Sequence, residues 1–122
     1  METRIKKIDN RTYTFVNEFI DRRDGFNHKT TLLCNGVELV TNNVHYINRT
    51  WECYTYETSM RGAVNILIDN KFNRYIARYK EENGIIRFKK GEKDRVIADF
   101  KDSDIYKELQ VLKDAIQQRD FD

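Results

Sequence analysis

The stretch KTTLLCNGVELVT, residues 29–41, contains the strongest hairpin signal in the first half of the chain. Asn35-Gly36 stands between two apolar runs rich in β-forming residues, and both turn residues tolerate positive φ. This pattern predicts a two-residue hairpin turn, and Asn42-Asn43 predicts a second tight turn before a strand at residues 44–48. The resulting register would place six side chains on one face of the sheet: Leu32, Cys34, Val37, Leu39, Val44 and Tyr46.

The opposite face of this sheet is expected to be mixed, with Val40 and Ile47 among polar residues. Mixed faces are typical of a solvated or partner-facing side, and this one would suit a homodimer contact. Upstream, RTYTFVNEFI (residues 11–20) carries aromatic residues at even spacing, which predicts another strand. The polar segment DRRDGFN (residues 21–27) predicts a longer hairpin loop between the two strands.

The second half of the sequence has helical periodicity. A long helix is expected to begin near Thr50, its N-cap, and to end at Asn83-Gly84, where glycine can adopt the left-handed conformation. A break near Asp69-Asn70 is an open alternative. The apolar stripe of this helix recurs at three and four residues: Cys53, Tyr56, Met60, Val64 and Leu67.

Two shorter helices are expected after residue 90. Residues 91–100 have apolar residues at helical spacing, although a hairpin pairing IIRF with RVIADF is an alternative. Ser103 is expected to cap the last helix. Its apolar face would consist of Ile105, Leu109, Leu112 and Ile116.

These elements predict an α+β fold in one domain of 122 residues. Residues 1–49 would be β-rich, an antiparallel sheet of three or four strands, and residues 50–122 mainly helical. The sheet would pack on the long central helix, with the two C-terminal helices completing the domain. The start of the chain is polar and no run is apolar enough to span a membrane, so we expect a cytoplasmic protein without a membrane partner.

Charge is distributed unevenly along the chain, although the formal net charge is only +2. Residues 71–95 contain nine Lys or Arg and four Asp or Glu, whereas residues 99–122 contain four basic and seven acidic residues. The chain therefore has a basic middle and an acidic end, and the basic part is the first candidate for contact with an anionic partner.

Catalytic and metal-binding motifs are not recognisable. The spacing of His28, Cys34, His45 and Cys53 does not fit the paired close ligands of zinc sites, so two buried thiols and two ordinary histidines are expected. Neither a G-x-S-x-G elbow nor a phosphate-binding P-loop occurs. We therefore expect no enzyme activity and no cofactor.

The segment KFNRYIARYKEENGIIRFKK, residues 71–90, interleaves cations with aromatic residues. Cations for phosphates and rings for bases are the requirements of a single-strand binder, but an ordinary amphipathic helix with a solvated basic face has the same pattern. Its candidate partner-binding residues are Arg74, Arg78, Lys80, Arg87, Lys89 and Lys90. Arg22 and Arg23, at the expected tip of a hairpin, are two further candidates, with solubility as the alternative explanation.

NRTWECYTYE, residues 48–57, contains the single Trp of the chain and is expected mainly to pack the helix on the sheet. Residues 32–60, with Asn35-Gly36, then N-R-T-W-E from Asn48 and Tyr54 and Tyr56, resemble small proteins of phages and mobile elements of low-GC Gram-positive bacteria. The resemblance implies a protein that counters host defence, with an anti-CRISPR inhibitor of a type II RNA-guided nuclease as the leading expectation. Its partner would be the host effector nuclease or its guide RNA complex, in the host cytoplasm. The alternative is a nucleic-acid-binding accessory protein that uses residues 71–95.

Overall fold

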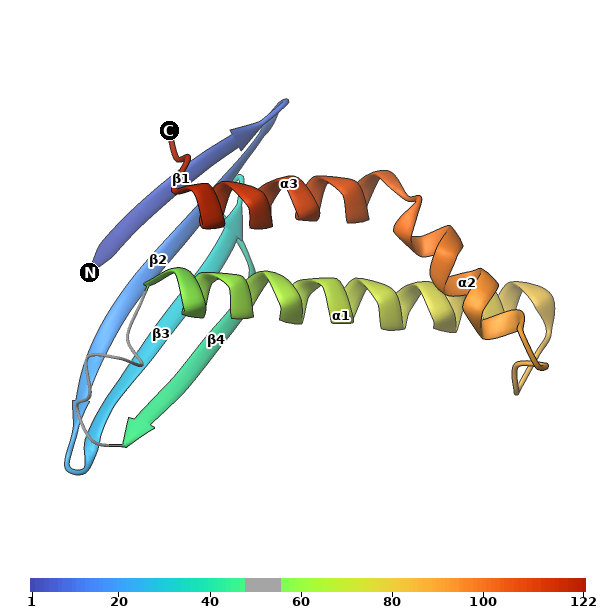
Figure 1. Ribbon diagram of the computed structural model, residues 1–122, viewed down its shortest axis with the longest axis horizontal. Helices are drawn as coiled ribbons and strands as arrows, with labels where there is room; N and C mark the ends of the chain where they lie inside the picture. Colours follow the sequence, from blue (N-terminus) through green and yellow to red (C-terminus); the bar gives the residue numbers. More distant parts are fainter. Residues whose placement is uncertain (48–55) are drawn as a thin grey trace.

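The computed structural model describes residues 1–47 and 56–122 and confirms the α+β fold (Figure 1). Four antiparallel strands pair in the order of the sequence, so the sheet is a simple meander. Among the strands of the described residues, each pairs only with its sequence neighbours, so β1 and β4 form the two edges of the sheet. The strands are β1 (Glu2–Ile8), β2 (Arg11–Arg22), β3 (Gly25–Cys34) and β4 (Val37–Ile47).

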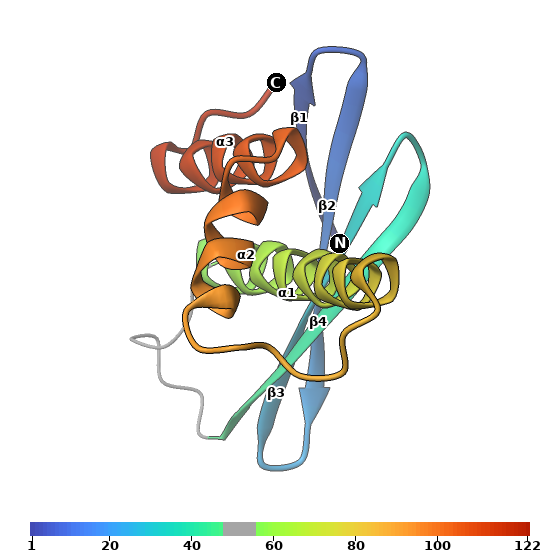
Figure 2. The same ribbon diagram turned by 90° about the vertical axis from the view of Figure 1, so that its right-hand side faces the viewer.

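Three helices follow the sheet: α1 (Tyr56–Asn83), α2 (Glu92–Lys101) and α3 (Asp104–Gln118). With 28 residues, α1 is roughly 42 Å long at 1.5 Å per residue. It crosses the sheet with its first half and projects beyond it, while α3 returns beside it and α2 joins them at the far end (Figure 1). Viewed along this projection, α1 and α3 lie in front of the sheet on one side (Figure 2).

The core lies between this side of the sheet and the two longer helices. Phe15 and Leu32 of the sheet, Met60 and Val64 of α1, and Leu112 of α3 are completely buried in it. The predicted apolar stripe of α1 is thus confirmed from Met60 to Leu67, as is that of α3 from Leu109 to Ile116.

Turns and helix ends are partly as predicted. The Asn35-Gly36 turn is confirmed, with φ of 50° and 81°. Gly84, with φ of 61°, follows the end of α1. Ser103 caps α3 by accepting a hydrogen bond from the Tyr106 amide at 3.4 Å.

One local prediction is wrong, and two alternatives to predicted helices are excluded. The longer loop at residues 21–27 is a two-residue turn, because Arg22 pairs with Gly25. The helix α1 continues through residues 69–70 without a break. Residues 92–101 form α2, so the alternative hairpin does not exist.

The second predicted turn, at Asn42-Asn43, is also wrong, because β4 continues through both residues. The side chain of Asn42 faces α1 and donates a hydrogen bond to the carbonyl oxygen of Ser59 at 3.0 Å. This contact satisfies the polar side chain within the strand, so the local turn preference of Asn does not decide its conformation.

The predicted register of β3 and β4 holds at the Cys34–Val37 pair and is wrong from Leu32 onward. An irregularity between Leu32 and Leu33 pairs Leu32 with Val40 in place of Leu39. A one-residue shift exchanges the faces of a strand. Val40 is therefore buried against the helices, whereas Leu39 is 36% exposed. Val40 and Ile47 were the two apolar residues that suggested a homodimer contact on the outer face of the sheet. Because Val40 lies on the inner face, only Ile47 remains for such a contact.

The sheet is tied to the helices by polar contacts as well as by the core. The Arg11 guanidinium donates two hydrogen bonds to the carboxylate of Glu108 on α3, at 2.5 and 2.8 Å, and the Tyr13 hydroxyl donates a third. Arg4 forms an ion pair with Glu57 of α1 at 3.2 Å. The cations of the sheet that face the helices thus have carboxylate partners.

Candidate nucleic-acid interface

The projecting part of the helical layer, residues 69–105, is here called the arm. All buried residues of α1 lie between Ser59 and Leu67, so the second half of this helix contributes none. The arm therefore consists of that half of α1, the following loop, α2 and the start of α3 (Figure 1). It receives no support from the main core and needs a small core of its own.

Aromatic side chains form this small core. The rings of Phe72 and Tyr75 on α1 lie 5.2 and 5.5 Å from the ring of Phe100 on α2. The ring of Tyr106 on α3 approaches Phe100 from another side at 5.5 Å. Phe100 is 4% exposed and the neighbouring Val96 is 1% exposed. These rings hold the three helices of the arm together, which favours the amphipathic-helix interpretation of the aromatic pattern.

The loop at the end of the arm, residues 84–91, is called the tip loop. Its Phe88 ring lies 6.1 Å from that of Tyr79, and the Lys80 ammonium lies 4.8 Å above the centre of the Phe88 ring. The loop begins with Gly84 and ends with Gly91, both at positive φ. Residues with a Cβ rarely adopt this conformation, so the two glycines permit the sharp reversals at its ends.

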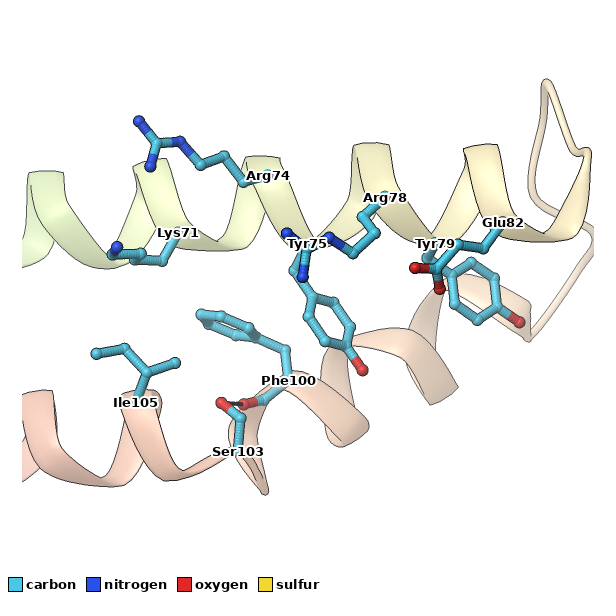
Figure 3. A pocket seen from close by; sticks show the side chains of 9 residues that line it. All are labelled: Lys71, Arg74, Tyr75, Arg78, Tyr79, Glu82, Phe100, Ser103 and Ile105. Carbon is cyan, nitrogen blue, oxygen red and sulfur yellow. Dashed lines mark hydrogen bonds between the residues drawn. The ribbon is translucent and has the colours of Figure 1, made fainter.

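A groove of about 400 Å³ lies where α1 faces the α2–α3 junction (Figure 3). Its α1 side combines three cations, two tyrosines and one carboxylate. Tyr75 and Phe100 point toward each other across it, whereas Arg74 turns away from α2 (Figure 3). Its lining residues are Lys71, Arg74, Tyr75, Arg78, Tyr79, Glu82, Phe100, Ser103 and Ile105.

The cations of the arm differ in their pairing from the cations of the sheet that face the helices. Within residues 1–47 and 56–122, no Lys or Arg of residues 71–95 lies within ion-pair distance of a carboxylate. Seven of these nine cations are exposed, and Lys71 and Lys80 are half-buried. By contrast, Arg4, Lys6 and Arg11 on the sheet all have acidic partners. Ion pairs within the described chain therefore do not neutralise these nine cations, although the arm as a whole, with ten Lys or Arg and eight Asp or Glu, has a formal net charge of +2.

The structure separates the residues predicted as partner-binding into three places. Arg74 and Arg78 line the groove, and Lys80, Arg87, Lys89 and Lys90 lie in or beside the tip loop. Arg22 and Arg23 lie at the β2–β3 turn, at an end of the sheet away from the arm (Figure 1).

Four residues of the groove were not predicted as site residues from the sequence: Glu82, Phe100, Ser103 and Ile105. Glu82 follows Arg78 by four residues, so a helical projection could have placed it on the same side. Ser103 and Ile105 reach the groove only through the tertiary arrangement of α3. The predictions for Thr50, Trp51, Cys53 and Tyr54 lie outside the described residues.

Other kinds of site have little support in the described part of the chain. No group of three or more His, Cys, Asp or Glu there could hold a metal ion. None of the described helices combines the length and apolar character that a membrane crossing requires. Comparison with protein families, curated proteins and solved structures finds no match for this chain.

Proposed function

We propose that this protein is a non-catalytic binding protein whose arm binds the phosphate backbone of nucleic acid. The observation that carries the proposal is the set of nine Lys and Arg of residues 71–95 without a carboxylate partner in the described chain. Lys and Arg that neutralise phosphates release condensed counterions, and this release drives sequence-independent binding. The groove adds a concave surface on which Arg74 and Arg78 can follow the backbone.

The proposed mode of binding relies on phosphates more than on bases. Phe72, Tyr75 and Phe88 pack against other rings of the arm and are half-buried, so only part of each ring is left for stacking on bases. A binder without fully exposed rings gains its affinity mainly from charge, which depends on salt but hardly on sequence.

The test is fluorescence anisotropy with labelled single-stranded and duplex oligonucleotides, at salt concentrations from about 50 to 200 mM. The slope of log K against log salt should fall by about 0.7 to 0.9 for each phosphate contact removed. We expect Arg74→Gln with Arg78→Gln to weaken binding and to reduce this slope by roughly twice that amount.

The matched control is Arg22→Gln with Arg23→Gln, which removes the same charge from exposed positions on the sheet. This variant should bind within about twofold of the unmodified protein, since its arm is intact. Equal losses in the two variants would mean that net charge, and not the arm, attracts nucleic acid. Salt-independent binding, or none, would refute the proposal.

A second candidate function is inhibition of a type II RNA-guided nuclease. The resemblance of residues 32–60 to small phage and mobile-element proteins favours it. In this role the arm would contact the guide RNA or an acidic patch of the nuclease complex. A pull-down with the tagged protein should recover the nuclease, more with guide RNA than without, and less with the Arg74/Arg78 variant. A nuclease that is neither recovered nor inhibited would exclude this candidate.

A further inference from the structure

The tip loop presents one apolar side chain to solvent at the far end of the arm. Ile86 is 88% exposed, far more than any other aliphatic side chain of the arm. Its neighbours Ile85 and Phe88 are half-buried, so Ile86 alone points outward. Burying an isoleucine is favourable, and an isolated exposed one at the end of a projection is therefore placed to enter a partner.

The tip loop is anchored at both ends. The Ile85 amide donates a hydrogen bond to the Lys80 carbonyl at 2.9 Å, and the Glu92 amide donates one to the Lys89 carbonyl at 3.0 Å. Phe88 adds the packing contact with Tyr79. Because these contacts fix the loop on either side of Ile86, little conformational entropy is lost when this side chain is inserted into a partner.

The surroundings of Ile86 are strongly basic. Arg87, Lys89 and Lys90 are exposed within four residues of it, and none has an ion-pair partner in the described chain. An apolar side chain flanked by unpaired cations is complementary to an apolar layer flanked by anions. Stacked bases between two phosphate backbones have this arrangement.

The same observations disfavour a lipid surface. Membrane binding scales with the apolar area that is buried, and the tip loop exposes only one large apolar side chain.

The structure of the arm also disfavours a flexible single strand as its ligand. Such strands are held mainly by stacking on aromatic rings, and the rings of the arm pack against one another. An aliphatic side chain acts as a wedge between bases that are already stacked.

We infer that the tip loop inserts Ile86 between two stacked base pairs of a nucleic-acid duplex while Arg87, Lys89 and Lys90 contact the flanking phosphates. This inference rests on the proposed function and adds the structural class of its ligand. Insertion opens one base step and bends the duplex there, which costs least at flexible pyrimidine–purine steps. Duplexes with a central TA step should therefore bind several-fold more tightly than A-tracts of equal length and charge.

The test uses a DNA duplex in which 2-aminopurine replaces the adenine of the central TA step, because 2-aminopurine fluoresces more strongly when it is unstacked. The unmodified protein should raise the fluorescence. Ile86→Ser should abolish the rise and weaken binding by roughly tenfold, with the salt dependence preserved. Since Ile86 is exposed, circular dichroism should show the same fold for this variant.

Val37→Ser is the matched control, because Val37 is 65% exposed and lies at the start of β4 on the sheet. It should keep the fluorescence rise. Salt-dependent binding without a rise, or with a rise that survives Ile86→Ser, would overturn the wedge but leave the proposed function intact. If Ile86→Ser instead abolishes binding to phosphatidylserine vesicles and the fluorescence never rises, the tip contacts lipid. Loss of all salt-dependent binding in the unmodified protein would refute the proposed function itself.

Discussion

Replacement of Glu108 by Leu tests whether a polar contact fixes α3 on the sheet. Glu108 is 8% exposed and accepts hydrogen bonds from the Arg11 guanidinium and from the hydroxyl of Tyr13, which is 2% exposed. The hydrogen bonds from Arg11 hold the pKa of Glu108 below its ordinary value, although burial acts in the opposite direction. Burial, reinforced by Glu108, raises the pKa of Tyr13, so this hydroxyl stays protonated and remains a donor.

The size of the destabilisation depends on which former partner of Glu108 can be solvated by water after the substitution. In Glu108→Leu, water can solvate the half-exposed Arg11, whereas the Tyr13 hydroxyl remains buried without this acceptor. A buried polar group without a partner costs about 1–3 kcal/mol, which is the expected loss in the free energy of unfolding. Leucine has a similar volume to glutamate, so the loss reports on the polar contact more than on packing.

A double-mutant cycle with Tyr13→Phe provides the assay, by urea denaturation followed by circular dichroism. Alone, Tyr13→Phe removes one hydrogen bond and should destabilise the protein by about 0.5–1.5 kcal/mol. In the Glu108→Leu background the same change removes the unsatisfied hydroxyl and should be stabilising. Equal destabilisation by Tyr13→Phe in both backgrounds would show that Tyr13 and Glu108 do not interact and that another contact fixes α3 on the sheet.

Three further predictions concern other parts of the molecule. Gly25→Ala should cost about 1–3 kcal/mol in urea denaturation, because a Cβ at this position would lie 1.9 Å from the Tyr46 carbonyl oxygen. Phe100→Ala should increase hydrogen exchange of α2 and leave the sheet amides protected, since Phe100 packs within the arm. Burial lowers the pKa of His28 from its ordinary value of 6.5, against the charge of Glu2. The unfolded chain then binds the proton more readily, so stability should fall as pH drops below about 6.5, and His28→Gln should reduce this dependence.

The features that the sequence predicted are those that depend on local interactions. The Asn35-Gly36 turn and the Ser103 cap each follow from the conformational preferences of one or two residues. The apolar stripe of α3 likewise follows from periodicity alone, because one face of that helix is buried along most of its length.

The errors arise where a distant residue decides the conformation. Asn42 remains in a strand because its side chain bonds to Ser59, 17 residues away. ETRIKKI, residues 2–8, has no clean alternation of apolar and polar residues, yet it forms β1. Its Arg4 and Lys6 lie on the helix-facing side because Glu57 and Asp120 neutralise them there. Pairing between residues so far apart in the chain leaves no local sequence signal.

The candidate site was predicted in composition but not in geometry. The sequence located the cations of the arm, because basic residues cluster in one segment whatever its fold. It could not show that Phe72 and Tyr75 pack on Phe100 of another helix, which leaves only part of each ring for stacking on bases. The exposure of Ile86 was not predicted either, because IIRF is also typical of one strand of a hairpin. In the structure, residues 92–101 form α2 in place of the second strand.

The contrast between the two ends of the molecule supports a functional explanation of the arm. A chain that stabilises Arg4 and Arg11 with carboxylates of the helices can place acidic partners beside cations. Along residues 71–95 no ion pair forms within the described residues, although four Asp or Glu occur there, and repulsion between neighbouring cations such as Arg74 and Arg78 destabilises an arm whose core contains few side chains. An arm that bound nothing would gain stability from a few Lys-to-Glu exchanges. Binding of a polyanion accounts for this cost, since phosphates would neutralise the same cations in the complex. Such exchanges at Lys89 and Lys90 should therefore raise the thermal stability of the free protein while they weaken its binding to DNA. If neither the thermal stability nor the DNA binding of such a variant changed, the charge of the arm would not explain its function.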